Sequence, residues 1–332
     1  MIAVAFDLNR SEDQRHILDA AAAMLSTSFP LERLRGGERD NLAPLASFGA
    51  FALTLSEKNG GAGLTLVEEA LLHRLFGRHL LSTRAVATAT AAVLAREIDR
   101  PELAAGLIAG DTEACAALWT GDETLVIDGD RATLAVLFHN ASASLLDIGG
   151  AQRQAAVGLG HTIPIARIVN ERLTIVGESK VDRVVAFADL LISAQLLGVA
   201  EVARDLAVEY AKLRRQFGKP IGAFQAIKHR CANMAIAAEM LSAQLDMAAI
   251  ALRDGGADAG FQVAALRRLA PGVALANARA CIQIHGGIGF SDESDAHRIL
   301  KQAHILARLG GGAPMLSFQS PMAPHIPIDG RT

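Results

Sequence analysis

The spacing of apolar residues changes twice along this chain and divides it into three parts. In the first part, apolar residues recur every three or four positions, and both Ser11–Gln14 and Thr65–Glu68 match the capping box that opens a helix. The middle part has short apolar or alternating runs, separated by turn sequences such as Gly121-Asp122, a pattern typical of β-hairpins. Helical spacing then returns and persists to Leu309. We predict an N-terminal helical domain (residues 1–112), a reduced antiparallel β domain (113–182) and a C-terminal four-helix bundle (183–332).

The third part is expected to hold four long helices with short connections, which predicts an antiparallel bundle. A glycine-containing break at Gly218–Gly222 separates the first two helices, and Asp254–Gly256 separates the second from the third. Pro271 falls inside the third and predicts a kink. The predicted helices are Val184–Arg215, Phe224–Ala248, Ala257–His285 and Ser294–Leu309.

Composition favours a helical protein, and three dispersed cysteines flanked by apolar residues favour reduced thiols in the cytoplasm. The chain is 51% hydrophobic but only 4% aromatic, which suits tightly packed helices rich in alanine and leucine. The net charge is −3 with both signs interspersed, so nothing favours nucleic acid or an anionic membrane as a partner. There is no run of about 18 apolar residues. No spacing of cysteine, histidine and carboxylate residues predicts a metal site. We expect no nucleic-acid partner, no metal and no membrane insertion.

Three stretches along the chain stand out, and the second and third carry residues suited to binding a dinucleotide. The first is a glycine-rich loop, Ser56–Gly63, and the second, Tyr210–Gly222, places Arg214 at a helix end. An arginine there can form bidentate, charge-assisted bonds with a pyrophosphate. The third stretch, Gln283–Phe290, contains glycines that let the backbone approach a ligand, and Gln283 offers both a donor and an acceptor.

In order and spacing, the three stretches together resemble the acyl-CoA dehydrogenase family over nearly the whole chain. The resemblance implies a fold of N-terminal helices, a β domain and a C-terminal four-helix bundle, with FAD as the cofactor. It implies the α,β-dehydrogenation of an acyl-CoA thioester, with an electron-transferring flavoprotein as electron acceptor. In this family two segments contact one flavin across a subunit interface, so the resemblance also implies an oligomer. The residues that it places at the cofactor are Arg214, Gln216, Phe217, Gln225, Gln283, Gly286 and Gly287.

The family's catalytic glutamate is missing from both positions where the resemblance would place it. Gly310 occupies the usual position after the fourth bundle helix, and Ala188 occupies the alternative position on the first. The next residue, Asp189, is either a relocated base or a carboxylate that favours the helix dipole near the helix start. The loop that packs on the flavin ring in the family is also altered, because Trp119–Glu123 is not followed by the usual Gly-Ser-Asp.

Three functions remain open from the sequence. The chain resembles the short, degenerate subunit of heteromeric, steroid side-chain-type acyl-CoA dehydrogenases, which implies a heterotetramer with a full-length subunit. It could instead be a self-sufficient homodimeric dehydrogenase that uses Asp189 as the base. It could also be a flavin-free structural or binding protein, since fold does not fix function. The expected pocket residues Ala188, Ser193 and Ala194 are small, which would admit a bulky acyl group.

Overall fold

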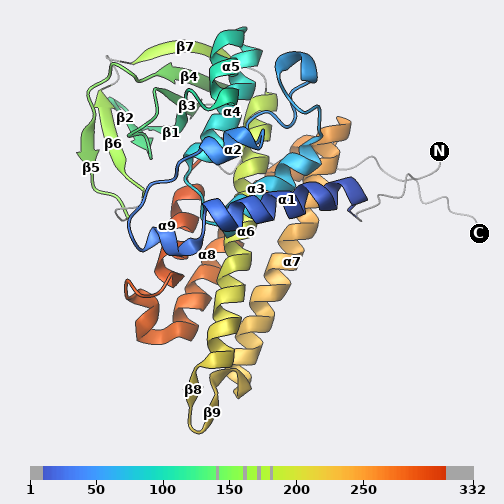
Figure 1. Cartoon of the computed structure of the whole chain (residues 1–332), viewed down its shortest axis with the longest axis vertical. Helices are drawn as coiled ribbons and strands as arrows, with labels where there is room; N and C mark the ends of the chain where they lie inside the picture. Colours follow the sequence, from blue (N-terminus) through green and yellow to red (C-terminus); the bar gives the residue numbers. More distant parts are fainter. Residues whose placement is uncertain (1–9, 140–141, 160–162, 170–172, 180–181, 312–332) are drawn as a thin grey trace, which may run out of the picture.

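The computed structural model describes residues 10–139, 142–159, 163–169, 173–179 and 182–311 and shows three packed regions (Figure 1). The N-terminal region is helical, as predicted. Both predicted capping boxes form, because the Ser11 and Thr65 side chains accept bonds from helix N–H groups and Gln14 and Glu68 bond back. Its helices are α1 (Glu12–Ser28), α2 (Ala43–Ser47), α3 (Leu66–Arg78), α4 (Arg84–Glu97) and α5 (Pro101–Ala109), with short 3₁₀ turns at Leu31–Leu34 and Glu57–Asn59.

The middle region is a seven-stranded sheet in the order β5-β6-β2-β1-β3-β4-β7. The prediction of a wholly antiparallel sheet is wrong, because β1 pairs with β3 in parallel. After the β1–β2 hairpin the chain returns to the other edge of β1, and this crossover makes β3 run in the same direction. The strands are β1 (Ala114–Trp119), β2 (Glu123–Ile127), β3 (Leu134–His139), β4 (Ser142–Asp147), β5 (Gln154–Ala156), β6 (Ile165–Val169) and β7 (Thr174–Ser179). The division into three domains stays a proposal.

The C-terminal region is the predicted bundle, but with three long helices and one short one. Its helices are α6 (Asp182–Leu213), α7 (Gln225–Asp254), α8 (Ala259–His285) and α9 (Ala296–Leu306). α9 ends earlier than expected because Arg267 of α8 donates hydrogen bonds to the carbonyl groups of Ala307 and Leu309, which fixes a non-helical end. Pro271 lies inside α8, which continues past it. A short hairpin, β8 (Arg215–Gln216) with β9 (Lys219–Pro220), joins α6 to α7.

α6 is the central helix and packs against α3 on one side and against α8 on the other. Its crossing with α3 is unusually close at two glycines. A Cβ on Gly198 would overlap the carbonyl oxygen of Arg74, and one on Gly77 would overlap that of Gln195. By length and composition, α6 and α7 are both long and apolar enough to cross a membrane. Neither was predicted from the sequence, because polar residues interrupt the run of apolar residues in both. The apolar stretch of α6 is 89% buried, as expected for a core helix.

Candidate functional site

The structure brings the two predicted base positions together. Asp189 lies on α6, and Gly310 follows α9 with φ of +83°, so close that a Cβ on Gly310 would overlap Oδ1 of Asp189. Asp189 is only 5% exposed, and its carboxylate is held by two groups. Nε of Arg267 lies 3.3 Å from its Oδ1, and the Gly311 N–H donates to the same oxygen over 3.1 Å. The space expected for a glutamate is therefore filled by a buried ion pair.

Burial is the main influence on the ionisation of this pair. It raises the pKa of Asp189 to about 6, against the opposing effects of the Arg267 charge and the Gly311 N–H. Burial also lowers the pKa of Arg267, which is 1% exposed. Arg267 donates in addition to the carbonyl oxygens of Ala307 and Leu309, so the pair joins α6, α8 and the segment after α9. Asp189 therefore has a clear structural role.

A cavity next to this pair is too small for a substrate. Its volume is about 10 Å³, which is room for no more than one water molecule. Ala188 belongs to its wall, whereas Asp189 does not. Two of the expected pocket residues, Ser193 and Ala194, are fully buried and lie outside the wall, so that expectation is wrong. They occupy other faces of α6, which is covered on nearly every side. The wall is formed by Val86, Ala87, Thr90, Ala116, Val136, Phe138, Ala188, Ile192 and Leu309.

The segment expected to pack on a flavin ring is a tight hairpin. Trp119 pairs with Thr124, and the Thr120 N–H donates to the carbonyl oxygen of Glu123 over 2.9 Å. The Trp119 indole N–H donates to the Gly121 carbonyl oxygen within the same turn. This closure leaves no extended loop to cover a ring. That the altered residues remove a flavin contact stays a prediction.

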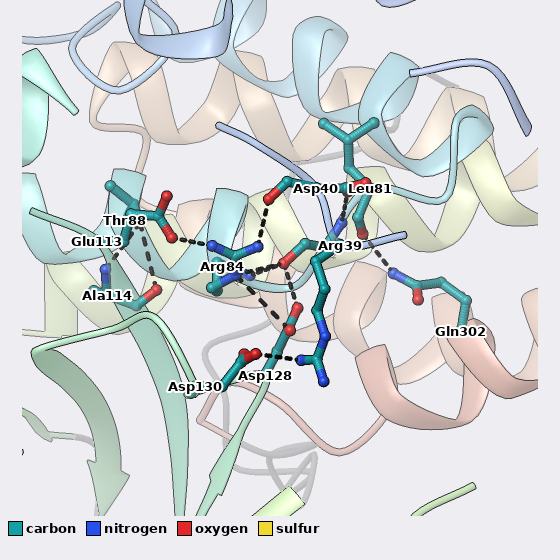
Figure 2. A network of polar contacts seen from close by, with 12 residues as sticks. Arg39, Asp40, Leu81, Arg84, Thr88, Glu113, Ala114, Asp128, Asp130 and Gln302 are labelled. Atoms are coloured by element: carbon teal, nitrogen blue, oxygen red, sulfur yellow. Dashed lines mark hydrogen bonds and ion pairs between the residues drawn. The ribbon is translucent and has the colours of Figure 1, made fainter. Parts of the chain in front are cut away.

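A buried polar network fixes α4 against the sheet (Figure 2). Arg84, at the start of α4, is fully buried and bonds to the Glu113 carboxylate and to the Asp40 carbonyl oxygen. The Ser82 hydroxyl donates to Asp128, and Arg84 Nε lies 3.8 Å from that carboxylate. Burial raises the pKa of Asp128 to about 6 despite the Arg84 charge. Because α4 supplies part of the small cavity's wall, this network helps to keep the cavity narrow.

The predicted cofactor residues lie at the other end of the bundle, around the β8–β9 hairpin at the bottom of Figure 1. Asp189 and Leu213 are 24 residues apart on α6, which is about 36 Å along the helix axis. The second and third motifs adjoin each other there, since the rings of Tyr210 and His285 stack with centroids 4.2 Å apart. Sequence reasoning missed this stack. All seven predicted cofactor residues are exposed: Arg214, Gln216, Phe217, Gln225, Gln283, Gly286 and Gly287.

This surface fits the nucleotide half of FAD. Among the described residues, neither the Arg214 guanidinium nor the Gln283 amide has a side-chain partner. A Cβ on Gly286 or Gly287 would meet nothing within 4 Å, so the backbone there is open to a ligand. Phe217 is 91% exposed and offers a ring face or edge to a partner. Among the residues that the structure describes, the cavity beside Asp189 holds about 10 Å³ and the hairpin at Trp119–Glu123 is closed, so neither of these two places has room for the ring half of FAD.

Comparison with known proteins places the chain among acyl-CoA dehydrogenases. Residues 184–315 match the acyl-CoA dehydrogenase C-terminal domain. The chain is 33% identical to acyl-CoA dehydrogenase IpdE2 of Mycobacterium tuberculosis over 262 residues, which cover 79% of each protein. It is 32% identical to acyl-CoA dehydrogenase FadE34 of the same organism, over 83% of this chain but only 40% of that longer protein.

The three-dimensional fold has relatives of the same kind. The structure of the ChsE4–ChsE5 complex from Mycobacterium tuberculosis includes a chain that matches with a TM-score of 0.76 and 21% sequence identity. The match covers 93% of this chain and 96% of that one. At this level of identity the likeness establishes the fold and not the chemistry. It shows that the helical, β and bundle regions are arranged as in those proteins.

Proposed function

Because this chain belongs to the acyl-CoA dehydrogenase family, whose members are flavin-dependent oxidoreductases, we propose that it is the non-catalytic subunit of a heteromer. Its partner in this proposal is a full-length subunit that carries the catalytic glutamate and the space for a flavin ring. Together the two chains dehydrogenate an acyl-CoA thioester at its α and β carbons in the cytoplasm. An electron-transferring flavoprotein accepts the electrons.

The observation that carries the proposal is the distance between two parts of this chain. One is the exposed surface that fits the nucleotide part of FAD, and the other is the filled position expected for the catalytic glutamate. About 36 Å of α6 lies between the open surface at Arg214 and the filled position at Asp189. An extended FAD molecule is shorter than this distance. A flavin held at Arg214 therefore cannot reach Asp189 of the same chain, which supports a ring position in the partner chain.

In the heteromer, this chain binds and orients the nucleotide part of FAD, and FAD when bound supplies the redox chemistry. Arg214 offers two parallel N–H groups to the pyrophosphate. Gln283 offers its amide to the adenosine or ribose edges, and the open backbone at Gly286 and Gly287 allows close approach. None of these residues moves a proton. Proton abstraction belongs to the partner's glutamate.

Exposed apolar side chains around this end of the bundle support an oligomer, because large apolar groups gather at sites of protein association. They come from the end of α6, the hairpin and the turn after α8, and the most exposed are Leu213, Phe217 and Phe290. Ile236 and Met240 are exposed farther along α7.

The alternative of a self-sufficient enzyme with Asp189 as its base has less support. A base must reach its proton within hydrogen-bond distance in a plausible substrate position. Asp189 instead faces Arg267 and Gly311, and the neighbouring cavity does not hold an acyl group. A flavin-free role has less support too, since the open groups at Arg214 and Gln283 match a dinucleotide.

Substituting Arg214 tests the proposal directly. In the complex with the full-length subunit, R214Q is expected to weaken FAD binding roughly 10- to 100-fold, because a hydrogen bond to a charged group contributes about 1.5–3 kcal/mol. Flavin fluorescence during titration of the apo-complex measures this affinity. R131Q, a change at an exposed arginine far along the chain from the cofactor residues, is the matched control and should bind FAD as the wild type does. Unchanged affinity in R214Q would contradict the proposed role.

A further inference from the structure

The rings of Tyr210 and His285 form a fixed contact between the ends of α6 and α8. They stack with 4.2 Å between their centroids and an angle of 23° between their planes. His285 is only 8% exposed, and its Nδ1 lies 2.8 Å from the carbonyl oxygen of Cys281. Because a carbonyl oxygen only accepts, Nδ1 carries a hydrogen and donates it, which fixes the rotation of the imidazole ring. Tyr210 therefore packs against a ring face that is held in place.

On the α6 side, the stack lies about one helical turn before Arg214. The Arg214 N–H donates to the Tyr210 carbonyl oxygen over 2.9 Å. The Arg214 carbonyl oxygen accepts from the Ile221 N–H over 2.8 Å, where the hairpin returns to the bundle. After Tyr210, the helix contributes the small, buried Ala211, and Leu213 is 78% exposed. Tyr210 is therefore the last large side chain of α6 that packs against the core, and the Arg214 backbone is anchored to it.

On the α8 side, the glycine turn starts directly after His285. Gly286 has φ of +65° and ψ of −141°, and the 3₁₀ turn Gly286–Phe290 then folds back against the helix end. A Cβ on Gly289 would lie 2.9 Å from the carbonyl oxygen of Ile282 and 3.0 Å from Cβ of His285. The position of His285 therefore determines where the open glycine backbone lies.

Resting on the proposed function, we propose that the Tyr210–His285 stack sets the spacing between Arg214 and the backbone at Gly286 and Gly287. Both segments must meet one FAD molecule at the same time. Contacts that are already in place before binding cost less to order. The two rings touch no ligand in this account. They are positioning residues, which act through Arg214 on one side and through the glycine turn on the other.

The affinity of the complex with the full-length subunit for FAD, measured by flavin fluorescence, tests the stack. Y210L should weaken FAD binding roughly 3- to 10-fold, the effect of losing one aromatic pair, and Y210F should restore it to within about twofold of the wild type. H285Q removes the other ring but keeps an N–H group for the Cys281 carbonyl oxygen, and should weaken binding by a similar factor. The double variant Y210L/H285Q should be no weaker than the weaker single variant, because the two rings form one contact.

A second cycle shows whether the stack acts through Arg214. In the R214Q background, Y210L should weaken FAD binding by less than about twofold, because the contact that it positions is already lost. F48L, the same kind of change at a half-buried phenylalanine of the N-terminal region, is the matched control and should bind FAD as the wild type does. Chemical denaturation checks that each variant is folded, and H285Q decides the result if Y210L is not.

The proposal is overturned if Y210L and H285Q bind FAD like the wild type, if Y210F is as weak as Y210L, or if Y210L loses the same factor with and without Arg214. These outcomes differ from a failure of the proposed function. Weakened binding in R214Q with normal binding in Y210L and H285Q removes the positioning role alone. Normal binding in R214Q contradicts the nucleotide site itself.

Discussion

Replacing Asp189 by alanine is expected to lower the free energy of unfolding by about 3–5 kcal/mol, the usual cost of breaking a buried ion pair from one side. D189A leaves the Arg267 guanidinium buried without its carboxylate and removes the acceptor of the Gly311 N–H. Chemical denaturation at neutral pH measures the change. D182A, at an exposed aspartate on the same helix, is the matched control and should shift the free energy by no more than about 0.5 kcal/mol.

The double variant D189L/R267M distinguishes a structural pair from a catalytic carboxylate. Removing both charges avoids an unpaired ion, so the double variant should recover more than half of the stability lost in D189A. Recovery is incomplete because Arg267 also donates to the carbonyl oxygens of Ala307 and Leu309. A D189A chain as stable as the wild type would show that the pair is not structural, and Asp189 would again be a candidate base.

Restoring the family's glutamate at Gly310 is expected to damage this chain and not to create an active enzyme. With φ of +83°, this residue has a backbone conformation that costs a side chain-bearing residue about 1–2 kcal/mol. The Cβ would also overlap Oδ1 of Asp189, and forcing extra atoms into a packed site costs about 1–3 kcal/mol more. G310E should therefore lose about 2–5 kcal/mol of unfolding free energy and show no oxidation of acyl-CoA when assayed alone.

The control for G310E is G272E. Gly272 lies on α8, is exposed, and has open space where a Cβ would be placed, so glutamate there should be neutral or stabilising. Both variants are compared by chemical denaturation and by reduction of an artificial electron acceptor. If G310E were as stable as the wild type and oxidised acyl-CoA by itself, the filled base position would not be what prevents activity.

The helices could be predicted because their signals are local. The capping boxes at Ser11 and Thr65 and the spacing along α6 specify a helix within one or two turns, whatever packs against it. Strand β5 is three residues long and mostly exposed, so it has no alternating pattern to detect. The parallel pairing of β1 with β3 depends on a crossover between strands, which no local pattern determines.

In the candidate site, too, the residues with a local sequence signal could be predicted and those that depend on distant contacts could not. Arg214 and Gln283 belong to contiguous motifs, so their positions could be identified in the sequence. The partner of Asp189 could not, since Arg267 lies 78 residues later, in an apolar helix without a local sign of a buried charge. The small cavity beside Asp189 was also beyond prediction. Its wall combines residues of α4, the sheet and α6, and Arg84 at the start of α4 bonds to Glu113 and Asp40, which are far away in the sequence.

The stoichiometry of FAD in the complex with the full-length subunit tests the proposed function most directly. Two unlike chains could form two flavin sites, each with the nucleotide part on one chain and the ring in the other. Only the site with its ring in the full-length subunit should form, because the ring position in this chain is filled. Absorbance of released flavin, divided by the amount of each chain, should therefore give one FAD for each pair of unlike chains, with no FAD on this chain alone. A chain that purified alone with a full complement of FAD and oxidised acyl-CoA would contradict the proposal.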